Sequence, residues 1–364
     1  MLGKIQFRTL LGEGGMGRVF SAHHEDMGCE VAVKVLGPAF EHHPQARERF
    51  LREARIAARI RTPHAVRVLD HACTSAVPYI VFEKVEGEDL ASLLHRRGTL
   101  SPLELTTVVR QLASAVDAVH AAGVVHCDVK LANVMVFENG GAIEAKLIDF
   151  GVARALDEAP LDGDEAPSGT IYAMSPEQIL KPDEAASHWD LWGLAVLAFT
   201  ALTGRPPFQG RSMIGVLGAA LQSQRESIDV ARMCLGPEVD KVFDRAFSIA
   251  VHDRFPTAAD FAEALAAALA PGITEADVVL ARIAASLMEE EEPVTAVRKR
   301  AEMITRVSPA CSDDRPNLHP TRKTRKTETD RTHATSTFKR FDTGRVLTSR
   351  RARSLPPIAA IASR

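Results

Sequence analysis

Short apolar segments and turn residues follow one another along the first part of the chain. Five short segments there are rich in β-branched and apolar residues and are separated by turn residues, which is typical of strands. They read FRTLLGEG, GRVFSAHH, CEVAVKVL, AVRVLDHA and YIVFEKV. Between the third and the fourth, Pro44 to Ile60 places Phe50, Ala54, Ala57 and Ala58 at helical spacing. The pattern predicts an antiparallel sheet interrupted by one helix.

Helical periodicity takes over from about Asp89 to Leu269. Apolar residues recur at helical spacing in DLASLLHRR, PLELTTVVRQLASAVDAVHAAG, WDLWGLAVLAFTALTG and EVDKVFDRAFSIA. Val124 to Glu177 instead predicts short strands and loops. Every candidate chemical motif after the first lobe lies in this stretch, as catalytic groups do on loops held by a scaffold. A further amphipathic helix is expected at Thr274 to Glu292. The chain is therefore predicted to be α+β, with a small sheet-rich lobe and a larger, mainly helical one.

Composition supports a globular protein. The 364 residues are 46% hydrophobic, which is ample for a buried core. No apolar run is long enough to span a bilayer, and the N-terminal residues lack the apolar core of a signal peptide. The five cysteines form no C-x-x-C pair, which fits reduced thiols rather than disulfides. We therefore expect a cytoplasmic protein without a membrane segment.

Charge divides the chain into an acidic body and a basic tail. Residues 315–364 contain 13 Lys and Arg against 3 Asp and Glu, whereas the net charge of the whole chain is −3. The tail is rich in Pro, Thr and Arg and poor in core-forming residues, so it is predicted to be disordered. Nucleic-acid binding, an acidic partner or autophosphorylation at its threonines are alternatives to a plain solvated tail, which is the favoured interpretation.

A glycine-rich stretch, LGEGGMGRVF, lies near the N-terminus. Gly12, Gly14 and Gly17 match G-x-G-x-x-G, in which absent side chains let backbone N–H groups approach phosphate oxygens. A dinucleotide fingerprint needs a helix that starts at the glycines, but GRVFSA continues as a strand. The stretch therefore favours a glycine hairpin folded over phosphates.

Lys34 ends the apolar segment VAVK and lies seventeen residues after Gly17. Such a lysine is ordinarily a surface residue whose stem packs along the strand. An inward-facing Lys34 needs an anionic partner, and Glu53, in the middle of the expected helix, is the natural candidate. A Lys34–Glu53 pair would aim the ammonium at nucleotide phosphates.

Two loop motifs, HCDVKLAN and LIDFGVA, supply the remaining chemistry. Asn133 and Asp149 offer the hard oxygen ligands that Mg²⁺ prefers. Asp128 can then accept the proton of an attacking hydroxyl, and Lys130 can neutralise the transferring phosphoryl group. Each motif alone could be an ordinary loop turn, but the order GxGxxG, VAVK, HxDxKxxN and DFG is specific.

With these motifs the chain resembles the eukaryotic-like (Hanks-type) serine/threonine protein kinases of bacteria over about residues 5 to 268. The resemblance implies a bilobal kinase fold, with an N-lobe at about 5–82, a hinge at 83–87 and a C-lobe at 88–268. A helical extension at 269–308 and the basic tail at 309–364 would follow. ATP and Mg²⁺ are the implied cofactors and proteins the implied substrates, while the sequence predicts no oligomeric state.

The resemblance also implies roles for individual residues. Asp128 and Lys130 would be catalytic, and Asn133 and Asp149 would bind metal. Phe82 would be the gatekeeper beside the adenine, and Lys130 with Thr170 indicates serine/threonine rather than tyrosine specificity. The implied ATP-binding residues are Leu11, Gly12, Glu13, Gly14, Gly15, Met16, Gly17, Arg18, Val19, Ala32, Lys34, Glu53, Glu83 and Val85.

Structural roles follow from the same resemblance. Asp190 and an ion pair between Glu177 and Arg254 would hold the larger lobe together, and His126 would support the catalytic loop.

One position departs from the family. Cys127 stands where most members have an arginine that grips a phosphorylated activation-loop residue. The loop itself, residues 152–169, has five acidic residues, one basic residue and Ser168 as its single hydroxyl. We therefore expect activity that does not depend on loop phosphorylation, and a buried, inert thiol in preference to a redox sensor.

Two functions remain open on the sequence alone. One is an active serine/threonine kinase. The other is a nucleotide-binding pseudokinase that acts as a scaffold. Because Lys34, Asp128, Asn133 and Asp149 are all present, the active enzyme is favoured.

Overall fold

The structure is a computed structural model that describes residues 4–13, 17–37, 40, 43–72, 77–139, 142–157, 171–228, 235–273 and 279. The described residues belong to a first compact unit, residues 1–301, and a second unit, residues 302–364, lies outside them. The expected helix at 274–292, apart from Val279, and the expected tail also lie outside the described residues.

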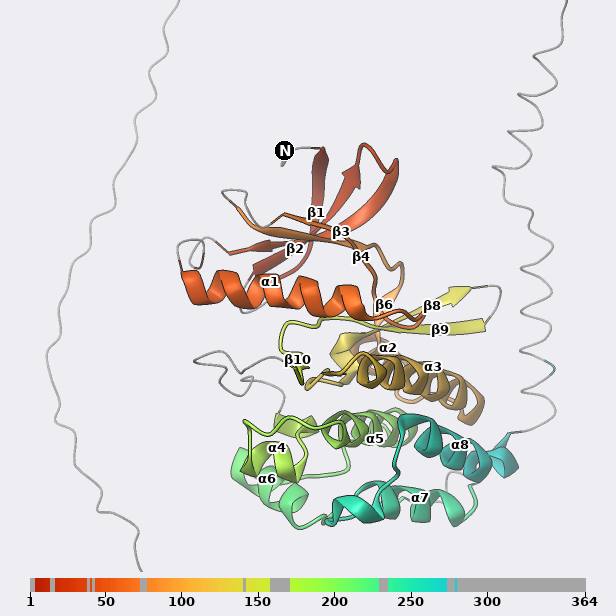
Figure 1. The fold of residues 1–364 in the computed structure, drawn as a ribbon. Helices are drawn as coiled ribbons and strands as arrows, with labels where there is room; N and C mark the ends of the chain where they lie inside the picture. The colour runs from red at the N-terminus through yellow and green to blue at the C-terminus, as the bar shows by residue number, and fades with distance from the viewer. Residues whose placement is uncertain are drawn as a thin grey trace, which may run out of the picture. The chain divides into compact units, whose positions relative to one another are not determined.

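The N-terminal strands form one antiparallel sheet, as predicted (Figure 1). Its strand order is β1-β2-β3-β5-β4. The strands are β1 (Ile5–Glu13), β2 (Gly17–His24), β3 (Cys29–Leu36), β4 (Val68–Ala72) and β5 (Tyr79–Glu83). The predicted helix is α1 (Pro44–Arg59), which lies between β3 and β4 in the chain.

Strand alternation gives this sheet two different faces. Val33 of β3 and Val81 of β5 pack in a small cluster with Ile5, whereas Ile80 belongs to the large core that also contains Phe50 of α1. Successive strand residues point to opposite faces. Lys34 therefore faces away from the Val33 side, toward α1, and the same alternation brings a charged side chain to the inner face.

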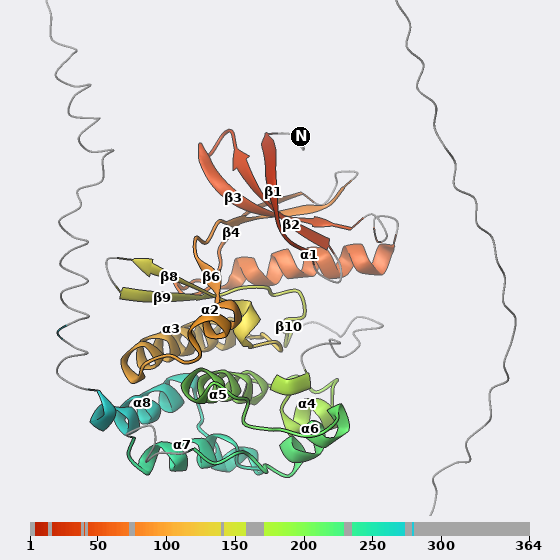
Figure 2. The same ribbon diagram turned by 180° about the vertical axis from the view of Figure 1, so that it is seen from behind.

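The C-terminal lobe is mainly helical, as predicted. Figure 2 shows these helices below the sheet. Its α-helices are α2 (Leu90–Arg97), α3 (Pro102–Ala121), α4 (Pro176–Leu180), α5 (His188–Thr203), α6 (Met213–Leu221), α7 (Glu238–Ala246) and α8 (Ala258–Leu269). Two of these helices begin at N-terminal capping residues: Ser101 and Glu104 form a capping box at α3, and Ser175 caps α4. The described part of the chain thus has the bilobal α+β architecture that the sequence predicted.

Helix α5 is buried on nearly every side, because its sequence is apolar all round. Gly193 on this helix faces the loop that carries HCDVKLAN. A Cβ atom at Gly193 would lie 2.6 Å from the Val129 carbonyl oxygen, a distance that real Cβ atoms do not show. The glycine therefore lets α5 approach the loop closely enough for its other residues to bind it.

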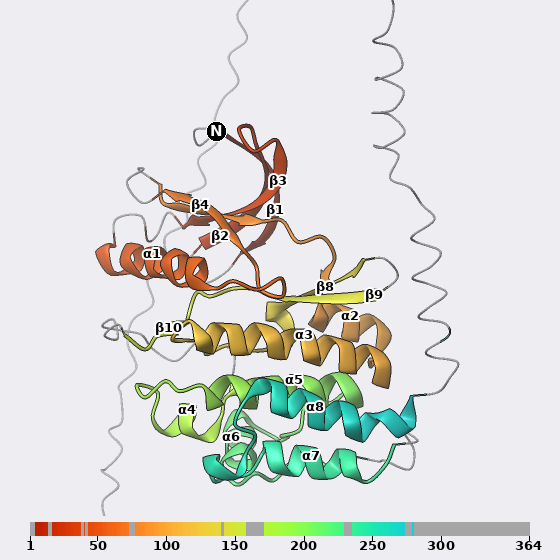
Figure 3. The same cartoon turned by 45° about the vertical axis from the view of Figure 1, so that its right-hand side comes forward.

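Short strands lie between the lobes, in the stretch predicted to contain strands and loops. Strand β8 (Val134–Asn139) pairs with β6 (Glu88–Asp89) and with β9 (Ala142–Leu147). Strand β7 (Val124–Val125) pairs with β10 (Arg154–Ala155). Figure 3 shows β8 and β9 lying between the sheet and helices α2 and α3.

The segment between the lobes runs from the end of β5 at Glu83 to the start of β6 at Glu88. The predicted hinge, 83–87, lies there, and the exact domain bounds stay a prediction. Across the helices of the described ranges, none has both the length and the apolar character needed to cross a bilayer.

Candidate active site

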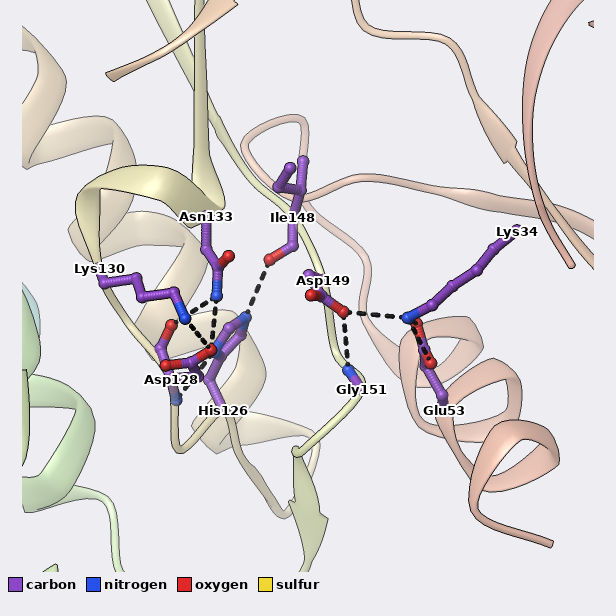
Figure 4. Close-up of polar contacts among 9 residues, drawn as sticks. All are labelled: Lys34, Glu53, His126, Asp128, Lys130, Asn133, Ile148, Asp149 and Gly151. Carbon is purple, nitrogen blue, oxygen red and sulfur yellow. Dashed lines mark hydrogen bonds and ion pairs between the residues drawn. The ribbon is translucent and has the colours of Figure 1, made fainter. Parts of the chain in front are cut away.

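The ammonium of Lys34 binds two carboxylates from different parts of the chain (Figure 4). Lys34 Nζ lies 2.6 and 2.8 Å from the two carboxylate oxygens of Glu53, and 3.1 Å from Asp149 Oδ1. Lys34 comes from β3 and Glu53 from α1, and Asp149 follows β9 two residues after its end. The predicted Lys34–Glu53 pair is therefore formed, and it is joined to the DFG motif.

Opposite charges control the protonation of this cluster. Burial disfavours the charged form of Lys34, but the carboxylates of Glu53 and Asp149 outweigh it and raise the pKa of the ammonium. The charge of Lys34 in turn lowers the pKa of Asp149, against the opposite effect of its burial. Lys34 is thus cationic and Asp149 ionised at neutral pH, which are the states that phosphate and metal binding need.

Asp128 lies at the centre of a second cluster in the HCDVKLAN loop. Its Oδ2 accepts hydrogen bonds from Lys130 Nζ at 2.8 Å and from Asn133 Nδ2 at 2.9 Å. The other carboxylate oxygen, Oδ1, is buried and has no hydrogen-bond partner among the described residues. A buried acceptor without a partner is costly, so this oxygen is suited to receive a donor such as a hydroxyl group.

Two side chains offer oxygen atoms to a cation. The Asn133 amide nitrogen donates to the Asp128 backbone oxygen and carboxylate, which turns the amide oxygen the other way (Figure 4). The Ile148 amide donates to the Asn133 carbonyl at 2.9 Å, so Asn133 and the DFG segment are held together. Asn133 and ionised Asp149 supply the hard oxygen donors that Mg²⁺ takes alongside phosphate and water. The donor set therefore fits Mg²⁺.

Asp190 of α5 positions the loop that carries HCDVKLAN. Its carboxylate accepts hydrogen bonds at 2.8 Å from the backbone amides of His126 and Cys127, and at 2.8 Å from His120 Nε2. His126 in turn lies 3.3 Å from the Ile148 carbonyl and packs edge-on against Phe150, with ring centroids 4.8 Å apart. The structural roles predicted for Asp190 and His126 are confirmed by these contacts.

Backbone strain occurs in the two loops that carry the predicted catalytic and metal-binding residues. Cys127 has φ 65° and Asp149 has φ 62°, a left-handed conformation that is uncommon for residues other than glycine. The bonds from Asp190 hold the first, and the Gly151 amide, 3.2 Å from Asp149 Oδ1, supports the second. Such strain persists where the surrounding structure enforces it, and it gathers at functional sites.

Cys127 is buried and packs as an apolar residue. Its side chain lies in a small cluster with Val125 and Trp189, and its thiol lies 3.5 Å from the Val125 carbonyl oxygen. Burial first, and then the charge of Asp190, raise the pKa of the thiol far above its ordinary value. A protonated, enclosed thiol is chemically inert, which agrees with the expectation of a buried structural cysteine.

The glycine hairpin forms as predicted at the positions that the structure describes. Gly12 lies opposite Val19, and Glu13 lies opposite Arg18, with which it also forms an ion pair of 3.0 Å. A Cβ at Gly17 would lie 2.2 Å from the Val35 carbonyl oxygen, so β2 and β3 could not pair this closely with a larger residue. Gly14, Gly15 and Met16 lie outside the described residues.

The other predicted ATP-binding positions lie on the sheet and at its end. Ala32 is opposite Phe82, the predicted gatekeeper, which is almost fully buried. Leu11 is half exposed in β1. The Glu83 amide donates to the Arg67 carbonyl at 2.9 Å. Over the described ranges, the Val85 amide has no protein hydrogen-bond acceptor.

The contacts of three polar side chains were not predicted from the sequence. Gln178 of α4 donates to the Cys127 carbonyl at 3.0 Å, and Gln111 of α3 accepts from the Ala145 amide at 2.7 Å. Lys146 of β9 forms an ion pair with Glu83. Gln111 and Lys146 lie outside the motifs of the sequence, and only the folded chain brings each of the three side chains to its partner.

Comparison with known proteins agrees with this geometry. Residues 5–263 match the protein kinase domain family. The chain is similar to the serine/threonine-protein kinases PknH and PknE of Mycobacterium bovis. With PknH it is 35% identical over 297 residues, which are 81% of this chain and 49% of the relative. With PknE it is 35% identical over 268 residues, which are 74% of this chain and 46% of the relative.

PknH of Mycobacterium tuberculosis is also 35% identical, over 269 residues that cover 74% of this chain and 42% of the relative. The chain thus matches about half, or less, of the length of these relatives. The family match covers most of the chain, and the fold and the Lys34–Glu53 pair agree with it. The chain therefore belongs to the protein kinase family.

Proposed function

We propose that this chain is a serine/threonine protein kinase, which transfers the γ-phosphoryl group of ATP to hydroxyl groups of proteins. The observation that carries the proposal is the position of Lys34, whose ammonium is bound by both Glu53 and Asp149. This arrangement joins the phosphate-binding lysine of one lobe to the metal-binding aspartate of the other. The kinases of Mycobacterium that match the chain support the same reaction class.

ATP would bind between the sheet and the catalytic loop. The glycine hairpin, with Gly12, Gly17 and the intervening residues, would cover the phosphates, and Lys34 would bind the α- and β-phosphates. Leu11, Val19 and Ala32 would line the adenine site. The Glu83 carbonyl and the Val85 amide would form hydrogen bonds with the adenine.

Transfer would then depend on the second cluster. Asp128 would orient the substrate hydroxyl and accept its proton at Oδ1, while Oδ2 remains bound to Lys130 and Asn133. Lys130 would stabilise negative charge on the transferring group. Asn133 and Asp149 would hold Mg²⁺, which supplies charge neutralisation at the phosphates when it is bound. Thr170, which the specificity prediction involves, lies outside the described residues.

The decisive test compares the parent protein with Asp128→Asn in labelled ATP and Mg²⁺, using a generic protein substrate. We expect the variant to lose transfer by more than about 100-fold, because a positioned general base contributes about 10²–10⁴-fold. Asp253→Asn is the matched control, since Asp253 is exposed at the end of a short 3-10 helix, Val251–Asp253, in the C-lobe. Equal labelling by the parent and Asp128→Asn would show that the assigned catalytic role is wrong.

The alternative function, a nucleotide-binding pseudokinase scaffold, is separated by the same experiment. A pseudokinase would bind ATP, measured by calorimetry, but would transfer no label even in the parent protein. The buried Asp128 Oδ1 favours the enzyme, because a scaffold has no use for an acceptor that lacks a partner within the described residues.

We further propose that activity does not require activation-loop phosphorylation. Cys127 has no cationic group, and its side chain is enclosed by Val125 and Trp189 rather than directed at a phosphate. Phosphatase treatment should therefore leave the transfer rate of the purified protein nearly unchanged. A loss of more than about tenfold, which corresponds to about 1.4 kcal/mol in the barrier, would overturn this proposal.

We also propose that the protein acts in the cytoplasm, in bacterial signalling, on protein substrates. The support is the kinase family of the chain and its similarity to serine/threonine-protein kinases of Mycobacterium.

A further inference from the structure

Lys146 forms an ion pair with the first residue of the hinge. Its ammonium lies 2.7 Å from Glu83 Oε1, and both side chains are mostly buried, with exposed fractions of 18% and 22%. Glu83 ends β5 in the N-lobe, whereas Lys146 lies on β9 beside the C-lobe. The pair therefore connects the two lobes at the point where the adenine would bind.

Strand β9 holds Lys146 in a fixed position. The Ala145 amide donates to the side chain of Gln111 at 2.7 Å, and the Leu147 amide donates to the His64 carbonyl at 2.8 Å. Ala145 and Leu147 are both fully buried in the core. Because strand residues alternate between faces, Lys146 between them projects to the opposite side. Its ammonium is thus presented to Glu83 by a rigid strand.

Glu83 is fixed just as firmly on its own side. Its amide donates to the Arg67 carbonyl at 2.9 Å, and its Oε1 accepts from the Arg67 amide at 3.1 Å as well as from Lys146. The side chain of Glu83 is therefore held by β9 and by the residue just before β4. Its backbone carbonyl and the nearby Val85 amide are the groups assigned to the adenine.

We propose that Lys146 is a positioning residue for nucleotide binding, which sets the hinge backbone at Glu83 and Val85 through its ion pair with the Glu83 side chain. The inference rests on the proposed function, because it concerns the same ATP site. Lys146 does not touch the phosphate-binding or proton-accepting groups. Its loss therefore weakens the binding of ATP and leaves the transfer step itself unchanged.

Lys84, the residue that follows Glu83, provides a matched control for Lys146. Lys84 forms an ion pair of 2.8 Å with Glu86, and its exposed fraction of 23% is close to that of Lys146. Glu86, however, is 76% exposed and lies in the hinge itself, so the Lys84 pair joins no second element. Lys84→Met and Lys146→Met remove the same charge and leave similar side chains.

The experiment measures ATP dissociation constants by calorimetry and the steady-state constants kcat and KM, below the melting transition of every variant. Lys146→Met should raise the dissociation constant and KM for ATP at least fivefold, with kcat changed less than twofold. Lys84→Met should change all three less than twofold. If Lys146→Met matches Lys84→Met, or acts on kcat alone, the inference is overturned.

A second variant keeps the test sound if Lys146→Met folds poorly. Glu83→Gln preserves the shape of the residue and its backbone, and it should reproduce the increase in KM. The double variant should be no worse than either single variant, because both remove one interaction. Additive losses in the double variant would contradict a shared pair. If the parent protein binds no ATP, the proposed function fails; if it binds ATP and Lys146→Met binds equally well, only the present inference fails.

Discussion

Two ion pairs that were both expected from the sequence differ in the number of contacts that hold their cations. Arg254 in the C-lobe binds both oxygens of Glu177, at 2.6 and 3.1 Å, and donates to the Ser248 and Ile249 carbonyls. Its guanidinium also lies 4.8 Å from the ring centroid of Trp192. Lys34 shares one ammonium between Glu53 and Asp149, and the Asp149 side chain is 49% exposed.

The difference separates a structural pair, Arg254–Glu177, from a pair in the proposed ATP site, Lys34–Glu53. A planar guanidinium satisfied on every side locks its surroundings, and removing it leaves a carboxylate without its cation. An ammonium is a compact charge that can exchange one oxygen partner for another. Because the Asp149 side chain is half exposed, Lys34 can exchange that contact for a phosphate in the proposed ATP site while it keeps its bonds to Glu53.

Removing Arg254 should have the largest effect on stability. We expect Arg254→Met to lower the free energy of unfolding by about 3–5 kcal/mol, because Glu177 then loses its partner in a partly buried site. Arg110→Met is the control, since Arg110 also binds both oxygens of a glutamate, Glu263, but on the surface. That exposed pair should contribute less than about 1 kcal/mol. Equal destabilisation in urea titrations would show that burial does not separate the two pairs.

Removing Lys34 should affect catalysis far more than folding. Lys34→Met should reduce the transfer rate by about 100-fold to 1,000-fold, the usual cost of one preorganised electrostatic contact. Its effect on unfolding should be smaller than that of Arg254→Met, because Glu53 can take up a proton when it loses its cation. Lys241→Met, in an exposed pair with Glu238, serves as the control in both assays. Transfer within tenfold of the parent rate would contradict the role of Lys34.

The acid sensitivity of the structural pair gives a smaller and directional effect. Burial favours the neutral form of Glu177, but the hydrogen bonds and charge of Arg254 outweigh it and lower its pKa below the ordinary value of 4.5. A lowered pKa in the folded state contributes stability above about pH 4.5, and this contribution is lost as the pH falls through the folded pKa. Glu177→Gln should therefore be less stable than the parent at pH 7, with a difference that shrinks below pH 4.5. Urea titrations from pH 3 to pH 7 measure this; a difference that grew on acidification would have the wrong sign.

A further expected effect concerns the reactivity of Cys127, whose amide binds Asp190. With Cys73, Cys234 and Cys311 replaced by serine, a thiol reagent at pH 8 should label exposed Cys29 rapidly. Buried Cys127 should react at least about 100-fold more slowly until the protein unfolds, because its raised pKa and its enclosure suppress the thiolate. Comparable rates for the two thiols in the folded protein would contradict an inert cysteine.

The sequence predicted the elements and their motifs well for physical reasons that are local. The lysine that ends the apolar segment VAVK and the three- to four-residue spacing in α1 are set by neighbours a few residues away, so a Lys34–Glu53 pair could be predicted before the fold was known. Lys146 and Gln111 offered no such signal. Their partners, Glu83 and Ala145, lie 63 and 34 residues away in sequence, and nothing local marks the contact.

The sequence by itself determined the lobes, the glycine hairpin, the Lys34–Glu53 pair and the family resemblance, because periodicity and motif order are written along the chain. The tertiary structure alone decided how tightly each group is held: the bond from Lys34 to Asp149, the single oxygen of Asp128 left for a donor, and the link between Lys146 and the hinge. These features arise because segments that are far apart in sequence pack together and exclude water from the polar groups between them. The partners of each charged group and the strength of its contacts therefore depend on packing, which a local sequence pattern does not contain.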